Sequence, residues 1–405
     1  MKIYGRRYSY LLFITLLWLI NGCKVSQKTT DKSANSTEDT VQTAIDTVFI
    51  ETPKIYITQK GDTLYSLDEE VSIETYRVLP DSISLMAVGD IMMGTKFPNT
   101  SYLPANDGAY LWKDVCNLLS SADITFGNLE GTILDGEGEP KECKNPKACY
   151  LFKMPSYLAE NLVTCGFDLI SVANNHANDF GPTGRRSTQA VLDSLGIGKA
   201  GSIESPYTVH KINGIYVGFV AFAPNKGTLL IHNQERAIEI VKELDSLADI
   251  VVVSIHGGAE GTDNQHVTRK REFYFGEDRG NIYEFSHTLI DHGADIILGH
   301  GPHVARAIEV YQDRLIAYSL GNFLTYGRFN LRGAAGLTPI LQANISVDGK
   351  FLSGQIHSFR QSYENGPLKD TSLSAANTIK KLTEEDFPEN KIFIEEDGRI
   401  FYIQN

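Results

Sequence analysis

The chain lacks several features that mark large classes of protein. Basic residues do not outnumber acidic ones: 37 Lys and Arg stand against 50 Asp and Glu, which gives a formal net charge of -13. Phosphate binding needs a basic surface, so this balance argues against a general nucleic-acid-binding protein. No internal repeat of solenoid length is evident. The remaining composition, 42% hydrophobic and 21% charged, is that of a globular protein with a sizeable buried core.

The apolar stretch near the N-terminus, Leu11–Ile20, is too short for a comfortable membrane span. It follows three basic residues and is followed by Gly22 and Cys23, an order that resembles a bacterial lipoprotein signal. We therefore predict a signal peptide over residues 1–22 and lipid attachment at Cys23, with an uncleaved N-terminal anchor as the alternative. Either interpretation places the body of the protein at the cell envelope, outside the cytoplasm. Residues 23–48 are polar and predict a flexible tether.

Cysteine is scarce, and the four cysteines after Cys23 lack the close paired spacing of a structural zinc site. Disulfides persist outside the cytoplasm. Cys143 and Cys149 flank a short loop, so we expect a bridge between them. We expect Cys116 and Cys165 to be free buried thiols.

The pattern along the chain indicates an α/β fold. Residues 49–82 predict a short β-rich lead-in, part of which resembles the opening of a LysM peptidoglycan-binding repeat without room for its second half. Over residues 83–330 apolar strands alternate with helices, which is typical of α/β architecture. Residues 331–405 carry Asp-Gly hairpin signals and predict a β-rich C-terminal extension.

Five polar clusters, four of them at the ends of apolar runs, carry most of the chemical information. Short apolar runs predict buried strands, and ligands bind at the carboxyl ends of strands in open α/β sheets. Asp, Asn, Glu and His arriving there together indicate a hydrolytic metal site. The clusters are Gly89–Gly94, Gly127–Glu130, Asn174–Asp179, His256–Glu260 and Gly299–His303.

The first two clusters supply oxygen ligands. Asp90 can coordinate a cation directly, although a helix cap is the alternative for a single Asp. Asn128 and Glu130 are two residues apart, so an extended segment would turn both toward one face. We count all three as candidate metal ligands.

The third cluster is the most specific. The Asn175 amide oxygen is a neutral metal ligand, and the adjacent His176 is suited to act as a general acid. Asp179 can orient that imidazole through a hydrogen bond, or can cap a helix.

The last two clusters bring three histidines. A lone strand-end histidine is more often structural than a ligand, but His300 and His303 follow the next strand after His256. Imidazole and carboxylate ligands together suit Zn, Mn or Fe, as one or two ions.

The order of these motifs, followed by Ala317–Leu324, resembles the CapA family of poly-γ-glutamate capsule biosynthesis proteins. The resemblance implies a four-layer α/β/β/α sandwich similar to calcineurin-like metallophosphoesterases. By position, the implied ligands include Asn175, His256 and His303, with His176 as the acid and His300 on substrate or metal. Two departures bear on the number of ions: Met92 stands where metallophosphoesterases have a histidine, and two residues rather than one separate His300 from His303.

Other polar residues near the motifs complete the predicted substrate-binding set. Asn322 follows a predicted strand and can contact an anion, and Arg306 can neutralise a carboxylate or phosphate. A solvated surface position is the alternative for each. The predicted substrate-binding set also includes His300 and Glu260.

These expectations combine into a function. The chain is expected to act on an anionic envelope polymer, such as poly-γ-glutamate, by metal-dependent hydrolysis or transfer at an amide or phosphoester bond. It would be membrane-anchored and able to join a capsule synthesis complex. The alternatives are a non-catalytic polymer-binding or export component, and a peptidoglycan-binding module.

Overall fold

The computed structural model describes residues 80–142 and 150–403. The predicted signal peptide, Cys23, the tether and most of the lead-in lie outside the described residues, as do Cys143 and Cys149. Within the described ranges, no helix is long and apolar enough to cross a membrane.

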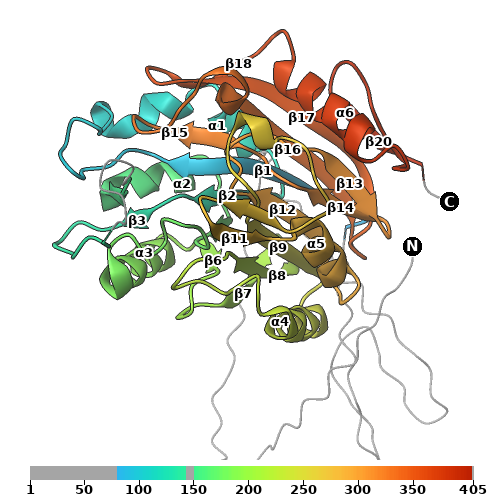
Figure 1. Cartoon of the computed structure of the whole chain (residues 1–405), viewed down its shortest axis with the longest axis horizontal. Coiled ribbons are helices and arrows are strands. Elements are labelled where there is room, and N and C mark those ends of the chain that lie inside the picture. The colour runs from blue at the N-terminus through green and yellow to red at the C-terminus, as the bar shows by residue number, and fades with distance from the viewer. Residues whose placement is uncertain (1–79, 143–149, 404–405) are drawn as a thin grey trace, which may run out of the picture. The chain divides into compact units, whose positions relative to one another are not determined.

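Two β-sheets lie at the centre of the described part of the chain (Figure 1). The strands of the larger sheet are β1 (Ser82–Met92), β2 (Ile124–Leu129), β5 (Leu169–Ser171), β6 (Gly198–Ala200), β15 (Asn322–Thr325), β16 (Leu337–Ser346), β17 (Phe351–Ser362), β18 (Gly366–Lys369), β19 (Ile392–Ile394) and β20 (Arg399–Tyr402). Their order is β19-β20-β17-β16-β1-β2-β5-β6, with β15 beside β1 and β18 beside β17. The antiparallel strands expected in the C-terminal region therefore extend this sheet, because β16 pairs with β1 from Ser82 to Val88.

The smaller sheet is built from the second half of the α/β alternation. Its strands are β7 (Tyr207–Ile212), β8 (Ile215–Phe222), β9 (Ile250–His256), β12 (Ile296–His300), β13 (Ile308–Tyr311) and β14 (Arg314–Ala317), in the order β13-β14-β12-β9-β8-β7. Two short two-stranded sheets pair β3 (Thr132–Ile133) with β4 (Lys153–Met154), and β10 (Glu272–Tyr274) with β11 (Glu277–Gly280).

Three of the described helices begin at residues that favour a helix start. The side chains of Asn233 and Asn281 accept hydrogen bonds from the backbone of Arg236 and Glu284, at the first turns of two helices. Pro182 occupies the first turn of another. The α-helices are α1 (Cys116–Leu119), α2 (Glu160–Thr164), α3 (Gly181–Ser194), α4 (Gln234–Leu247), α5 (Ile282–Ile290) and α6 (Ser374–Asp386), with short 3-10 turns η1 (Asn106–Trp112), η3 (Ser156–Ala159), η4 (Thr262–Asn264) and η5 (Gly333–Gly336).

Strand alternation produces four layers. On β1, Met86 and Val88 belong to a core that also holds residues of α1, α2 and α3, on the outer face of the larger sheet. A second core packs α4 and α5 on the outer face of the smaller sheet. Between the sheets, the rings of Phe126 and Phe219 meet edge to face with centroids 5.7 Å apart. This arrangement confirms the α/β/β/α sandwich.

The chain crosses from the smaller sheet to the larger one next to Asp90. β14 belongs to the smaller sheet and β15 to the larger, so residues 318–321 pass from one to the other. Glycine permits this close approach: a Cβ atom on Gly89 would lie 2.0 Å from the carbonyl oxygen of Gly321, and one on Gly299 would lie 2.2 Å from that of Tyr318. The crossing places Asn322 next to Asp90.

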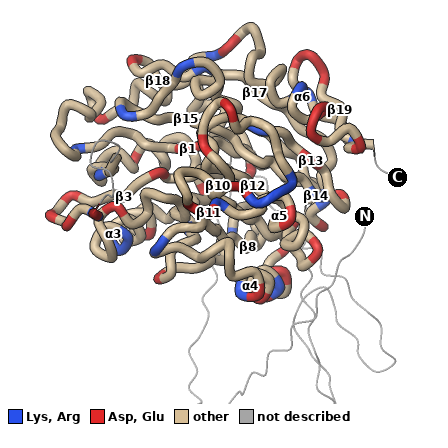
Figure 2. The backbone as a smooth tube through the Cα atoms, viewed as in Figure 1, with Lys and Arg blue, Asp and Glu red and all other residues tan. Residues whose placement is uncertain are grey.

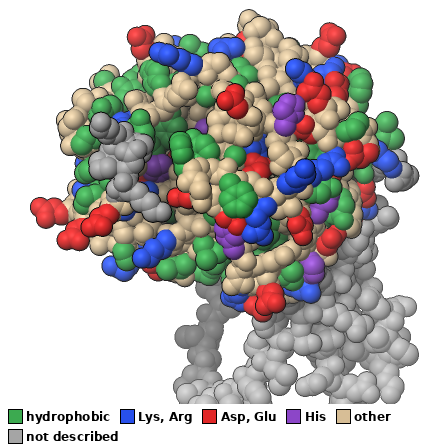
Figure 3. Space-filling view, viewed as in Figure 1, with side chains coloured by type: hydrophobic (Ala, Val, Ile, Leu, Met, Phe, Trp, Pro, Cys, Tyr) green, Lys and Arg blue, Asp and Glu red, His purple; other side chains and the backbone are tan. Residues whose placement is uncertain are grey.

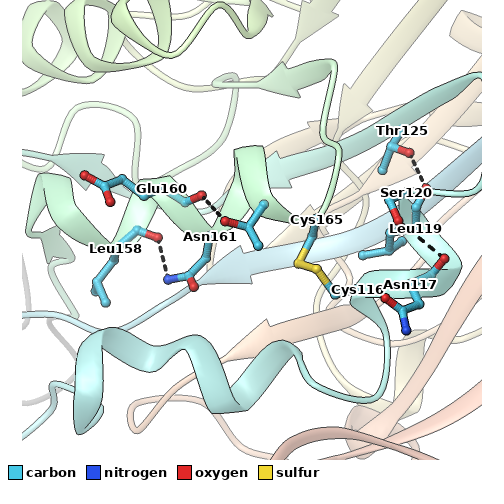
Figure 4. The surroundings of a disulfide bond; sticks show 10 residues. Cys116, Asn117, Leu119, Ser120, Thr125, Leu158, Glu160, Asn161 and Cys165 are labelled. Atoms are coloured by element: carbon cyan, nitrogen blue, oxygen red, sulfur yellow. Dashed lines mark hydrogen bonds between the residues drawn. A yellow bond between two sulfur atoms is a disulfide. The ribbon is translucent and has the colours of Figure 1, made fainter.

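One prediction about the cysteines is wrong. Cys116 and Cys165 are not free thiols but form a disulfide, with Cα atoms 4.5 Å apart (Figure 4). Cys116 begins α1 and Cys165 directly follows α2, and both helices pack in the core of the larger sheet. The two cysteines are 49 residues apart, so only the tertiary packing brings them together.

We expect this disulfide to contribute substantially to stability. Replacing both Cys116 and Cys165 with serine opens a loop spanning 49 residues, and chain entropy predicts a loss of about 4 kcal/mol in the free energy of unfolding. Urea unfolding followed by circular dichroism measures the loss. Reductant should lower the urea midpoint of the wild type more than that of the double variant. The double variant controls for the reduction of any other disulfide. Equal effects of reductant on both proteins would contradict the expectation.

Candidate metal centre

Strand register brings the predicted residues into two facing rows. In the larger sheet, Asp90 pairs across the strands with Asn128 of β2 on one side and Asn322 of β15 on the other. In the smaller sheet, His300 of β12 pairs with His256 of β9. All five are at most 1% exposed. The site therefore lies between the sheets, at the carboxyl ends of parallel strands.

Three side chains from both sheets converge on one point. Asp90, Glu130 and His256 each offer a ligand atom, and these atoms lie within 4.8 Å of one another. Glu130 Oε2 is 3.6 Å from His256 Nδ1, and Asp90 Oδ1 is 3.4 Å from His300 Nδ1.

Several buried atoms at this point have no hydrogen-bond partner within the described structure: Glu130 Oε1 and both ring nitrogens of His256 and His300. Buried polar atoms are nearly always paired, and such a concentration of exceptions needs an explanation. Carboxylate oxygens and imidazole nitrogens are the donor set of Zn, Mn and Fe. The residues therefore fit a divalent cation.

The electrostatics of the site suit a cation as well. Burial alone raises the pKa of Asp90, but the nearby His300 and His303 outweigh it and hold that pKa well below its usual range. Burial and the charge of Asp90 raise the pKa of Glu130 well above its usual value. Burial lowers the pKa of His256 well below its usual value, which keeps this imidazole in the neutral form that binds metals.

His303 is held against Asp90. Its Nδ1 lies 2.8 Å from Asp90 Oδ2 and 3.2 Å from Asn322 Oδ1. Burial disfavours the charged ring, but the contact with Asp90 outweighs burial and raises the pKa of His303 to about 10. The residue adopts a left-handed backbone with φ of 58°, a conformation that costs energy outside glycine.

Asn322, predicted to bind substrate, positions this histidine. Its side-chain nitrogen donates to the backbone oxygens of His303 and Ala335, at 3.2 and 3.0 Å. Both ends of the Asn322 amide therefore serve the loop that carries His303.

The two asparagines Asn128 and Asn174 link the clusters. Asn128 Nδ2 donates to Asp90 Oδ1 at 2.8 Å and to Glu130 Oε2 at 2.9 Å, so its nitrogen faces the carboxylates. Asn174 donates to Asn128 Oδ1 and to the backbone oxygen of Leu129, and accepts from the backbone of His176. Asn128, predicted as a ligand, thus acts here as a hydrogen-bond bridge. Asn174 was not predicted, and its signal was only that it adjoins Asn175.

The predicted pair His176 and Asp179 is in contact. His176 Nδ1 lies 2.8 Å from Asp179 Oδ2, which leaves Nε2 for proton transfer. Lys141 Nζ lies 2.5 Å from Asp179 Oδ1 and donates to the backbone oxygen of Asn175 at 2.9 Å. The side-chain oxygen of Asn175 is buried without a hydrogen-bond partner in the described ranges, as a ligand awaiting a cation would be.

Two phenylalanines cover these groups. Phe152 lies against His176, with ring centroids 4.2 Å apart, and stacks on Phe329 at 5.2 Å. Phe329 also meets His303 edge to face at 5.4 Å. These rings restrict water around the imidazoles, and no motif in the sequence marked them.

Glu260 and Arg306 lie in a supporting network. Glu260 pairs with Arg279 at 2.9 Å, with 18% of its side chain exposed. Arg306 is 1% exposed and bonds both oxygens of Glu272, at 3.0 and 2.8 Å. Its guanidinium also donates to the backbone oxygens of Ala259 and Asn264. Arg306 therefore holds the loop after His256 and is not presented to a substrate.

Around these buried groups the surface carries charges of both signs. Figures 2 and 3 show Lys and Arg interspersed with Asp and Glu over the visible face.

Arg185 fixes the far side of the histidine loop. It bonds the side chain of Asn178 and pairs with Glu204, at 2.7 Å from Nη2 to Oε1. The hydrogen bond from Arg185 is the main reason that the pKa of Glu204 falls from 4.5 to about 2; partial burial opposes the shift and Ser202 adds to it.

This ion pair predicts a pH effect on stability. A lowered folded pKa gives stabilisation that is complete above about pH 4.5 and lost as the pH falls toward 2. We expect Glu204→Gln to be less stable than wild type at pH 6, with the difference vanishing near pH 2. Urea midpoints across this range test it, and Glu239→Gln, an exposed glutamate paired with Arg236, should keep the wild-type profile. A constant difference from pH 6 to 2 would refute the assignment.

Comparison with solved structures finds distant likenesses. A putative 5'-nucleotidase from Staphylococcus aureus has a TM-score of 0.37 and 13% identity, covering 75% of this chain and 58% of that chain. A 5'-nucleotidase precursor from Thermus thermophilus has a TM-score of 0.37 and 12% identity, covering 78% and 61%. Likenesses at this level say nothing about activity.

Relatives by sequence are more informative. The PGA biosynthesis protein CapA of Bacillus subtilis is 28% identical over 372 residues, which cover 88% of this chain and 90% of the relative. The capsule biosynthesis protein CapA of Bacillus anthracis is 29% identical over 265 residues, which span 60% of each protein. The model of the family described as bacterial capsule synthesis protein PGA_cap matches residues 84–326, more than half of the sequence. This chain therefore belongs to the PGA_cap family of bacterial capsule synthesis proteins, which confirms the resemblance to CapA.

Proposed function

We propose that the protein is a metal-dependent hydrolase or transferase that acts on a capsule or envelope polymer. The observation that carries this proposal is a set of buried ligand atoms, on Glu130, His256 and His300, that have no hydrogen-bond partner among the described residues, together with the hydrogen-bonded pair His176–Asp179. A binding protein needs neither a coordination set closed off from water nor an oriented imidazole next to it.

Asp90, Glu130 and His256 would hold the cation, with His300 beside Asp90 as a further ligand. Asn175 is another candidate ligand, because its side-chain oxygen is buried without a hydrogen-bond partner among the described residues. Zn, Mn or Fe suits this donor set. When bound, such an ion supplies Lewis acidity and lowers the pKa of a coordinated water. Burial keeps His256 neutral and available as a ligand.

The protein's own groups would handle the proton. Asp179 accepts from His176 Nδ1 and also from the backbone nitrogen of Phe152, so the ring is fixed and Nε2 can protonate a leaving group. Lys141 pairs with the other oxygen of Asp179 and holds that carboxylate in place. Phe152 and Phe329 exclude water from the imidazoles.

The setting is proposed from the relatives and the N-terminus. The B. subtilis relative is named for PGA biosynthesis and the B. anthracis relative for capsule biosynthesis, so we propose poly-γ-glutamate or a similar anionic polymer as substrate. Cleavage before Cys23 and lipidation there would anchor the protein at the outside of the cell envelope, with residues 23–48 as a tether. A capsule synthesis complex is the proposed assembly.

Metal binding is the first test. We expect the purified protein to hold a divalent ion, and the variants Glu130→Gln and His256→Ala to lose at least about tenfold in affinity. Elemental analysis gives the stoichiometry, and at 100 times the dissociation constant the ion should stabilise the wild type by about 2.7 kcal/mol. Glu309→Gln, a buried carboxylate paired with Tyr318 and His287, is the matched control. Metal-free protein that chelators leave unchanged would end the proposal.

Turnover is the second test. With γ-glutamyl peptides and simple phosphoesters as substrates, His176→Ala should lower kcat by about 10²- to 10⁴-fold with unchanged metal content. His357→Ala, a histidine on β17 that contacts Gln342, should behave as wild type. If no substrate is turned over, and polymer binding survives chelation, the protein is instead a non-catalytic component of capsule assembly.

A further inference from the structure

A tyrosine-lined cavity that is wide open to solvent lies at the end of β15, outside the metal centre. Its volume is about 500 Å³, within the range of small-molecule sites. Four of its seven lining residues are tyrosine, and they come from segments far apart in the sequence: the loop before η1, η1 itself, the end of β15 and the turn after β17. The residues that matter below are Tyr102, Tyr110, Tyr326, Tyr363, Gly327 and Glu364.

The cavity is joined to the metal centre by three consecutive residues. Gly327 lines it, and Phe329, two positions on, packs against both His303 and Phe152. The hydroxyl of Tyr363, on the opposite wall, donates to the backbone oxygen of Phe329. A molecule in the cavity would therefore lie close to Phe329, one of the two phenylalanines that cover the imidazoles of the metal centre.

The lining is amphipathic and carries no positive charge. Tyrosine presents a flat apolar ring and one hydroxyl, with little conformational entropy to lose. Glu364 adds an acceptor carboxylate, and none of the seven lining residues is Lys, Arg or His. The nearby guanidinium of Arg328 is engaged over the rings of Tyr102 and Tyr150, at 4.8 and 4.9 Å.

This lining selects among ligand classes. A chain with a carboxylate on every repeat would bring negative charge toward Glu364, and none of the lining residues carries a positive charge to receive it. An aliphatic side chain would find no aliphatic wall, since the lining has neither Leu, Ile, Val nor Met. A pyranose ring has apolar C–H faces that can lie on aromatic rings and hydroxyl edges that can bond the tyrosine hydroxyls and the carboxylate.

We propose that this cavity binds a neutral sugar unit, a hexose or N-acetylhexosamine of an envelope glycan. The site would hold a glycan next to the metal centre while the reacting bond lies elsewhere. The inference goes beyond the proposed hydrolysis, because the cavity contains none of the residues assigned to the cation or to the proton.

Binding of triacetylchitotriose and of maltotriose to the full chain tests the proposal by calorimetry, with chelator present throughout. We expect at least one trisaccharide to bind, and Tyr363→Ala to weaken it tenfold or more. Tyr363 is 45% exposed, so its replacement leaves the core intact, and Tyr363→Phe should retain most of the affinity because the ring remains. Tyr326→Ala is a second variant from another wall. Tyr216→Ala, on β8 of the smaller sheet and 37% exposed, is the control and should bind as wild type.

The outcomes separate this inference from the proposed function. His256→Ala should bind the trisaccharide as wild type does, whether or not the protein proves to be an enzyme. The sugar site is overturned if neither sugar binds. It is also overturned if Tyr363→Ala and Tyr326→Ala both bind the sugar with the affinity of the wild type. Binding of a γ-glutamyl pentapeptide that is weakened by the same two variants would also overturn it, since the cavity would then serve the anionic chain.

Discussion

The whole site depends on the register between neighbouring parallel strands. Asp90 pairs with Asn128 and Asn322 in the larger sheet, while His300 pairs with His256 in the smaller one. A slip of one residue would turn these side chains to the opposite face, into the helix-covered cores. The glycine contacts of Gly89 and Gly299 with the crossing segment help to fix the two sheets against each other at this point. The strand register that builds the two sheets therefore also positions the residues of the site.

The strand register buries the carboxylates of Asp90 and Glu130 together, and their charges set the protonation of the groups around them. Asp90 is held ionised by the imidazoles near it, whereas burial and Asp90 push the pKa of Glu130 upward. The ion pair of Asp90 with His303 relieves part of this repulsion. A divalent cation would relieve the remainder, because it would favour the ionised form of Glu130 and use the unpaired nitrogens of His256 and His300. Burying these groups together costs free energy, and binding of a cation would offset that cost.

Most of the elements and the row of polar strand ends could be predicted from the sequence, because buried parallel strands leave continuous apolar runs and their polar ends stand out. The clusters that begin at Gly89, His256 and Gly299 fall at the carboxyl ends of β1, β9 and β12, as predicted. What could not be predicted comes from tertiary packing. The Cys116–Cys165 bond joins two helices that are neighbours only in the folded core. Lys141 and Phe329 reach the site from loops that contain no recognisable motif. Arg306 was predicted to bind substrate, but its guanidinium is hydrogen-bonded to Glu272.

The two departures from the metallophosphoesterase pattern meet beside the first carboxylate. Met92 stands where that pattern has a histidine, and its side chain is fully buried among the hydrophobic residues of the larger sheet, where it offers no nitrogen ligand. The wider spacing after His300 leaves room for a left-handed turn at His303, which brings this imidazole back to the other oxygen of Asp90. The site thus keeps an imidazole beside its first carboxylate but takes it from the opposite sheet. His303 is engaged in that contact, whereas Asp90, Glu130 and His256 are the described residues whose ligand atoms converge within 4.8 Å of one another.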